Sequence, residues 1–121
     1  MTKGYFSKGE LKCSHCGEYF FNKNTLLRLN GVREEFGKPM LVTSGYRCKE
    51  YNSLRGFTQT HATGQAVDIS CSRKDAFKLL KIALNFGFTG IGIKQKGEGR
   101  FIHLDDLATN EERIRPTIWS Y

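Results

Sequence analysis

Residues 90–105 have the sequence GIGIKQKGEGRFIHLD. Two apolar segments, 90–94 and 100–105, flank a run of turn-forming residues at 96–99, so the stretch predicts two strands joined by a turn. Side chains alternate along a strand, which places His103 and Asp105 on the same face. We therefore expect a pair of strands that carries an imidazole and a carboxylate side by side.

Two further strands are expected before this pair. Residues 66–71 alternate, with Val67, Ile69 and Cys71 on one face and Asp68 on the other. Residues 40–46 form a short apolar run with β-branched residues, which is typical of a strand. The polar segment 48–60 is expected to be a loop. The aromatic tail, 111–121, is expected to lie on the sheet.

Two helices complete the predicted fold. The first runs from about 24 to 36, with Asn22 or Asn24 as its cap and Gly37 as its end. The second runs from about 73 to 86, capped by Ser72 and stopped by Gly87. Its expected apolar stripe is made of Ala76, Phe77, Leu80, Ala83 and Leu84. The sequence thus predicts one α+β domain, residues 1–121, with a mostly antiparallel sheet, two main helices, and Phe6 and Leu11 packed onto it.

Charge and hydropathy restrict the surroundings in which this domain acts. The chain has 121 residues, a formal net charge of +7 and a sequence pI near 9.4, which imply attraction to polyanions. Its basic residues are scattered, so a solvated basic surface is favoured over a nucleic-acid patch. No apolar run reaches the ~18 residues that span a bilayer, and the start lacks a signal peptide. We expect synthesis in the cytoplasm and no membrane insertion.

Three residues offer a ligand set for a metal. His61 and Asp68 lie seven positions apart in HATGQAVD, and His103 lies in the later strand. Two imidazoles and a carboxylate are typical of a catalytic zinc site, in which the fourth position stays open for water. A single histidine is more often an ordinary core or surface residue, so the prediction depends on these side chains converging in the fold.

A series of spaced motifs resembles the M15 peptidases, which are zinc D-alanyl-D-alanine carboxypeptidases and L-alanyl-D-glutamate endopeptidases of peptidoglycan stem peptides, phage endolysins among them. The motifs are Ser44-Gly45-Tyr46-Arg47, Asn52, His61-x-x-Gly64-x-Ala66-x-Asp68-Ile69, Phe101-Ile102-His103-x-Asp105, Arg115 and Trp119. The resemblance covers the chain from about residue 6 onward. It implies the fold shared by D,D-peptidases and the Hedgehog signalling domain, with His61, Asp68 and His103 as ligands of Zn²⁺.

The resemblance also implies roles around the metal. Arg47 would hold a substrate carboxylate, although it could instead pair with Glu50 on the surface, and Ser44 would hydrogen-bond the substrate or simply end a strand. Asp105 is the candidate general base, and its alternative role is to orient His103. Many relatives place an acidic residue three positions before the last histidine, where this chain has an arginine. Glu98 and Asp106 remain alternative bases, and departures in the segment 55–59 leave the substrate preference open.

Four cysteines remain outside this site: Cys13, Cys16, Cys48 and Cys71. Without a secretory signal, reduced thiols or thiolates on a metal are favoured over disulfides. Cys13-x-x-Cys16-Gly17 looks like half of a zinc knuckle, and a complete tetrahedral site would need two more ligands. The alternatives are a second, structural zinc and reduced thiols packed as small apolar groups.

We therefore expect a monomeric zinc-dependent peptidase that cuts peptidoglycan stem peptides, either as a D,D-carboxypeptidase or as an L-alanyl-D-glutamate endopeptidase. It would act on the bacterial cell wall, and the lack of a signal peptide suits a phage endolysin. The alternative is a non-catalytic, Hedgehog-like binding module on the same zinc scaffold. A weaker third reading combines a four-thiolate zinc site with a basic nucleic-acid surface. No nucleic-acid partner is expected in the preferred reading.

Overall fold

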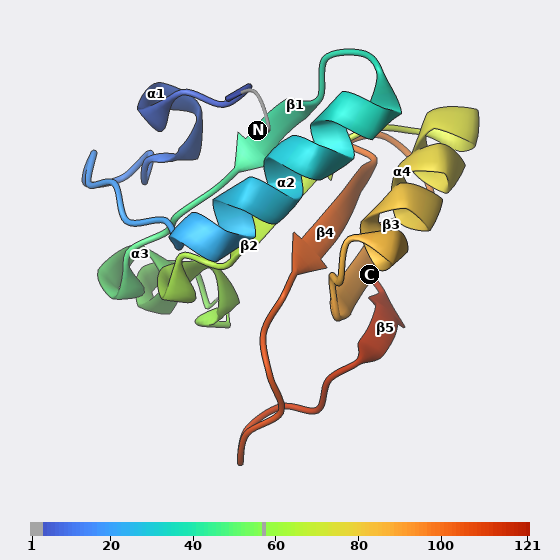
Figure 1. Ribbon diagram of the computed structural model, residues 1–121. Helices are drawn as coiled ribbons and strands as arrows, with labels where there is room; N and C mark the ends of the chain where they lie inside the picture. The colour runs from blue at the N-terminus through green and yellow to red at the C-terminus, as the bar shows by residue number, and fades with distance from the viewer. Residues whose placement is uncertain (1–3, 57) are drawn as a thin grey trace.

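The computed structural model describes residues 4–56 and 58–121 and has an α+β fold (Figure 1). Five strands form one sheet in the order β1-β2-β4-β3-β5. All neighbouring strands are antiparallel except β3 and β5, which are parallel. The elements in chain order are α1 (Lys8–Leu11), α2 (Lys23–Phe36), β1 (Leu41–Ser44), α3 (Lys49–Arg55), the 3-10 turn η1 (Thr60–Thr63), β2 (Ala66–Ser70), α4 (Arg73–Asn85), β3 (Gly90–Lys94), β4 (Phe101–Asp105) and β5 (Thr117–Ser120).

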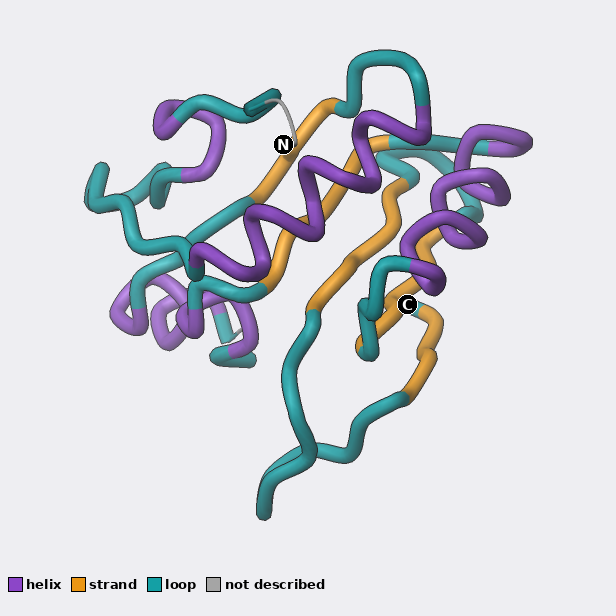
Figure 2. Tube along the Cα trace, in the orientation of Figure 1, coloured by secondary structure: helices purple, strands orange, loops and turns teal. Residues whose placement is uncertain are grey.

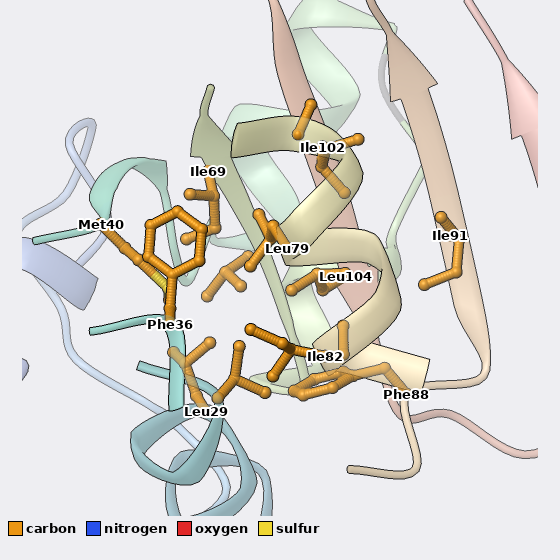
Figure 3. Packing of buried hydrophobic residues seen from close by; sticks show 14 of the residues in the cluster. Leu29, Phe36, Met40, Ile69, Leu79, Ile82, Phe88, Ile91, Ile102 and Leu104 are labelled. Atoms are coloured by element: carbon orange, nitrogen blue, oxygen red, sulfur yellow. The ribbon is translucent and has the colours of Figure 1, made fainter. Parts of the chain in front are cut away.

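The two long helices, α2 and α4, cover one face of the sheet (Figures 1 and 2). Their buried side chains meet those of the strands in one apolar cluster (Figure 3). Leu29 comes from α2, Leu79 from α4, and Ile69, Ile102 and Leu104 from the central strands. The alternation of the strands thus assigns one face to the core and leaves the opposite face for polar groups.

The predicted first helix is confirmed, and its ends follow from local chemistry. The side chain of Asn22 accepts the N–H of Thr25 at 3.0 Å, so Asn22 and not Asn24 is the cap. Gly37 ends the helix with φ of 83°, a left-handed conformation that favours glycine. These two residues set the bounds of α2 at Lys23 and Phe36.

The predicted apolar stripe of the second helix is partly wrong. Ala76 and Ala83 are buried as expected, but Phe77 is 73% and Leu84 56% exposed. Leu79 and Ile82 occupy the buried positions instead. Both sets of residues recur at helical spacing, and the orientation of the helix over the sheet decides which set enters the core.

Two segments have more regular structure than expected. The segment 48–60, predicted as a loop, contains the helix α3, which Cys48 caps through its sulfur and Gly56 ends at φ of 69°. The sequence of this segment has no helical apolar pattern, because most of this helix is exposed. The tail does reach the sheet, where β5 pairs with β3 and becomes an edge strand. Among the described residues, no helix is long and apolar enough to cross a membrane.

Candidate metal centre and cleft

The three predicted ligands converge on the polar face of the sheet. Asp68 on β2 lies directly opposite His103 on β4, and His61 comes from η1, just before β2. The Asp68 Oδ1 atom is 3.1 Å from His103 Nδ1 and 3.3 Å from His61 Nε2. One ligand atom from each residue lies within 4.8 Å of the other two. The convergence that the sequence could only hypothesise is therefore present in the structure.

Each histidine is held by its other ring nitrogen. His61 Nδ1 is 2.8 Å from the carbonyl oxygen of Gly45, which can only accept, so the Nδ1–H group donates to it. His103 Nε2 is 2.7 Å from Asp105 Oδ2. Such partners fix the tautomer and orientation of a metal-binding imidazole and strengthen it as a ligand. His61 thus presents Nε2, and His103 presents Nδ1, to the space beside Asp68.

Asp105 is fully enclosed and paired with a cation. Its carboxylate is 0% exposed and accepts two hydrogen bonds from Arg115, from Nε at 2.9 Å and from an Nη group at 2.8 Å. The N–H of Leu107 also donates to it, at 3.3 Å. Arg115 is itself 7% exposed, so the structure contains a buried, bidentate ion pair directly behind His103.

Two glycines of β3 make room for this arrangement. A Cβ atom on Gly90 would overlap the Asp105 carboxylate and the Arg115 side chain. A Cβ on Gly92 would lie 2.6 Å from Nε1 of Trp119, whose ring packs 5.0 Å from that of His103. The absence of side chains at Gly90 and Gly92 therefore lets Arg115 and Trp119 pack directly against this strand on the polar face of the sheet.

The charges of the site follow from its burial and pairing. Burial opposes ionisation of Asp68, but hydrogen bonds from His103 and His61 outweigh it and hold its pKa well below the usual range. Burial lowers the pKa of His61. Burial acts the same way on His103, yet the hydrogen bonds to Asp105 and Asp68 prevail and raise its pKa. Asp68 is therefore a carboxylate, which is the form that a metal ligand requires.

A cavity of about 770 Å³ opens beside the two histidines. Its walls include four basic side chains and two aromatic ones, and Glu112 is the only carboxylate among its lining residues in the part of the chain that the structure describes. The lining residues include His61, His103, Arg47, Lys49, Glu112, Arg113, Arg115, Trp119 and Tyr121. The candidate metal centre thus borders a cavity with a predominantly positive wall.

The other predicted residues are placed as follows. Arg47 lines the cavity, where burial lowers its pKa and the charge of Asp68 opposes that effect. Ser44 ends β1 opposite Asp68 but is not among the lining residues. Asp106 is used elsewhere, because it accepts hydrogen bonds from Thr25 at 2.8 Å and from Gln65 at 3.0 Å.

Glu98, the other alternative base, lies in the turn that joins β3 to β4 and is not among the lining residues. Two functional candidates were not recognised as such from the sequence. Arg115 was noted only as part of a motif, and nothing in local spacing indicated its partner Asp105. Glu112 carried no signal at all, because its position in the cavity wall depends on the path of the segment between β4 and β5.

The donor set fits zinc. Two imidazole nitrogens and one carboxylate oxygen are ligands that Zn²⁺ prefers, and three protein ligands are the number found in catalytic sites. The backing of His61 by Gly45 and of His103 by Asp105 supplies the outer contacts that such sites require. These three residues are therefore the ones that would hold the ion.

Comparison with known proteins agrees with this geometry. A family model described as Peptidase M15 matches residues 3–105, which include all three candidate ligands and Asp105. The tail with Glu112, Arg115 and Trp119 lies beyond that match. No curated protein is similar enough in sequence to be matched. The match spans well over half of the chain, and the chain belongs to the M15 family of peptidases.

Proposed function

We propose that the protein is a zinc-dependent peptidase that hydrolyses peptide bonds in the stem peptides of peptidoglycan. The observation that carries the proposal is the His61, Asp68 and His103 cluster at the edge of a cavity with a basic wall. A zinc ion held there would activate a water molecule and polarise the scissile carbonyl. The family to which the chain belongs supports peptide hydrolysis. The stem peptide of peptidoglycan as the substrate is part of the proposal.

The charge of the cavity supports this substrate class. Four basic side chains line it, Arg47, Lys49 and Arg113 among them, whereas Glu112 is the one carboxylate among the described lining residues. Stem peptides carry carboxylates close to both bonds that the family cuts, and a guanidinium binds such a planar group through two parallel hydrogen bonds. Arg47 is the best placed for this task, because its backbone N–H donates to the carbonyl of His61, which keeps it beside the metal centre.

Asp105 is assigned the second of the two roles that the sequence left open. An enclosed carboxylate that holds His103 on one side and Arg115 on the other has no free path to a water molecule in the cavity. It orients His103, in the manner of carboxylate–histidine–zinc triads. Glu112, as the carboxylate of the cavity wall, is then the candidate acceptor of the proton from water.

Digestion of purified peptidoglycan tests the proposal directly. The protein is supplied with Zn²⁺, and the released muropeptides are identified by mass spectrometry, which reveals the bond that is cut. His61→Ala is expected to abolish fragment release. His15→Ala removes an imidazole that is not among the lining residues of the cavity, and it is expected to retain fragment release. Absence of fragments from the zinc-loaded wild type would contradict a wall peptidase.

The enclosed position of Asp105 also gives the binding-module alternative a definite test. A module of this kind would keep the metal and the basic cavity without a working base. It would bind soluble stem peptides in equilibrium dialysis and leave them intact, with or without added Zn²⁺. Hydrolysis of the same peptides by the wild type would exclude this alternative.

A further inference from the structure

A second group of potential metal ligands lies away from the cleft histidines. The sulfur atoms of Cys13, Cys16 and Cys48 all lie within 4.8 Å of one another, although 35 positions separate the first from the last. Cys13 is buried, Cys48 is half-buried and Cys16 is exposed. Three thiols that converge from two distant segments are a recognisable ligand set for a soft metal ion.

The backbone around the first two cysteines has the shape of a metal-binding turn. The N–H of Cys13 donates to the carbonyl of Glu18 at 2.8 Å, and the N–H of Gly17 donates to the carbonyl of Cys13 at 2.8 Å. Gly17 has φ of 75°, which a side chain would disfavour. This tight turn brings Cys16 back beside Cys13 and leaves both sulfurs on the side that faces Cys48.

Backbone N–H groups already point at these sulfurs. The N–H of Cys48 donates to the sulfur of Cys13 at 3.4 Å, and the N–H of Tyr51 donates to the sulfur of Cys48 at 3.4 Å. Donors of this kind stabilise the negative charge of a thiolate, and the thiolate is the form that binds metal. The sulfurs of Cys13 and Cys48 thus have polar partners, which differs from a packing of small apolar groups.

The fourth cysteine does not belong to this group. Cys71 follows β2, packs against the apolar core, and its thiol contacts the carbonyl of Ile69 at 3.5 Å. The four-thiolate site considered from the sequence is therefore wrong for the described residues, since the metal-ligand group there contains only Cys13, Cys16 and Cys48.

We propose that Cys13, Cys16 and Cys48 bind a second zinc ion that fastens the turn of residues 13–18 to the segment just before α3. Thiolates are preferred ligands of Zn²⁺ in structural sites. No fourth ligand atom joins this group among the described residues, so a water molecule would be the fourth ligand. The imidazole of His15 is engaged elsewhere, stacked on Tyr51 and 4.0 Å from a carboxylate oxygen of Glu50.

This second site would also set the position of the cleft arginine. Arg47 lies between Tyr46, whose N–H donates to the carbonyl of Leu11 at 2.8 Å, and the ligand Cys48. The N–H of Arg47 itself donates to the carbonyl of His61. A zinc ion bound by Cys48 would add a third anchor to this segment and so restrict the position of the guanidinium in the cavity. This consequence rests on the proposed function, whereas the second zinc site does not.

Metal counting on variants purified under reducing conditions tests the inference. The wild type is expected to contain two zinc ions per chain, Cys16→Ser one, and the matched thiol control Cys71→Ser two. Cys16 is exposed, so its replacement leaves the core intact. Replacement of zinc by cobalt adds a spectroscopic readout, because thiolate-to-cobalt charge-transfer bands should be present in the wild type and greatly reduced in Cys16→Ser.

His61→Ala separates this inference from the proposed function. It should lose the cleft ion and keep both the second ion and the charge-transfer bands. A wild type with a single zinc ion that His61→Ala removes, or cobalt protein without thiolate bands, would overturn the second site and leave the proposed peptidase intact. A wild type whose only zinc ion is bound by the thiolates would support the second site and contradict the proposed zinc peptidase.

Discussion

Replacement of Asp105 by asparagine should weaken zinc binding and stability together. The change keeps the size of the side chain and removes its charge. In the structure that charge is fully buried, lies 2.7 Å from His103 Nε2 and accepts two hydrogen bonds from Arg115. The variant therefore alters the contact behind a candidate metal ligand and leaves the ligand atoms themselves in place.

The magnitudes follow from these contacts. Loss of the charge leaves the 7% exposed guanidinium of Arg115 without its partner, which for a buried pair costs about 3–5 kcal/mol of unfolding free energy. Loss of a carboxylate behind a ligating histidine lowers metal affinity by about 10–100-fold. If Asp105 only orients His103, turnover at saturating Zn²⁺ should recover most of the wild-type rate.

Two measurements separate orientation from base catalysis. Zinc affinity is measured by competition with a chromophoric chelator, and the hydrolysis rate is measured as a function of free Zn²⁺. The double variant Asp105→Asn/Arg115→Met should regain part of the lost stability in urea unfolding, because neither buried charge remains, while its zinc affinity stays low. A single variant that binds zinc as tightly as the wild type yet is slower by about 10²–10⁴-fold would refute the reasoning and identify Asp105 as the base.

Three further outcomes are expected. Glu112→Gln should lower kcat by about 10²-fold or more with zinc content unchanged, whereas the exposed neighbour Glu111→Gln should be neutral; equal effects of the two would remove Glu112 from the mechanism. Gly92→Ala should cost about 1–3 kcal/mol in urea unfolding and shift the fluorescence of Trp119, since the added carbon would lie 2.6 Å from its Nε1 atom; unchanged stability and fluorescence would contradict the close packing. Burial opposes ionisation of Asp105, but His103 and Arg115 outweigh it and hold its pKa well below the usual range. The free energy of unfolding that this charge contributes is therefore present in full above pH ~4 and is lost as the pH falls below it. The free energy of unfolding, measured from pH 7 to pH 3, should decline more in the wild type than in Asp105→Asn.

The sequence predicted the elements whose local signals are strong. The alternation in 66–70, 90–94 and 101–105 and the cap of α2 at Asn22 are confirmed by the structure. The helix α3 was missed because a short, mostly exposed helix has no apolar period, and its cap is a cysteine sulfur, which is not a usual capping group. The buried face of α4 was partly misassigned, since only packing on the sheet distinguishes Leu79 from its neighbours.

The site shows the same division. His61, Asp68 and His103 could be named as a set because their residue types suit a catalytic zinc site and the resemblance to M15 peptidases implies them as its ligands, whereas only the fold brings them together. The role of Asp105 could not be decided, because it depends on which ring nitrogen of His103 faces the carboxylate and on Arg115, ten positions later on another segment. The members of the cysteine cluster likewise could not be named, because the fold places Cys48, just before α3, beside Cys13 and Cys16 and leaves Cys71, just after β2, out of the group.

Two of the three candidate ligands come from a different kind of structure than most of the cavity wall. Asp68 and His103 lie on central, hydrogen-bonded strands, while the cavity wall is drawn mainly from segments 47–63 and 112–121, at the periphery of the sheet. Connecting segments tolerate insertions and replacements far better than paired strands do. Directed evolution confined to Lys49, Thr58, Gln59 and Arg113, which line the cavity outside the strands and the candidate ligands, could therefore reshape the wall while His61, Asp68, His103 and the Arg115–Asp105 pair are kept unaltered.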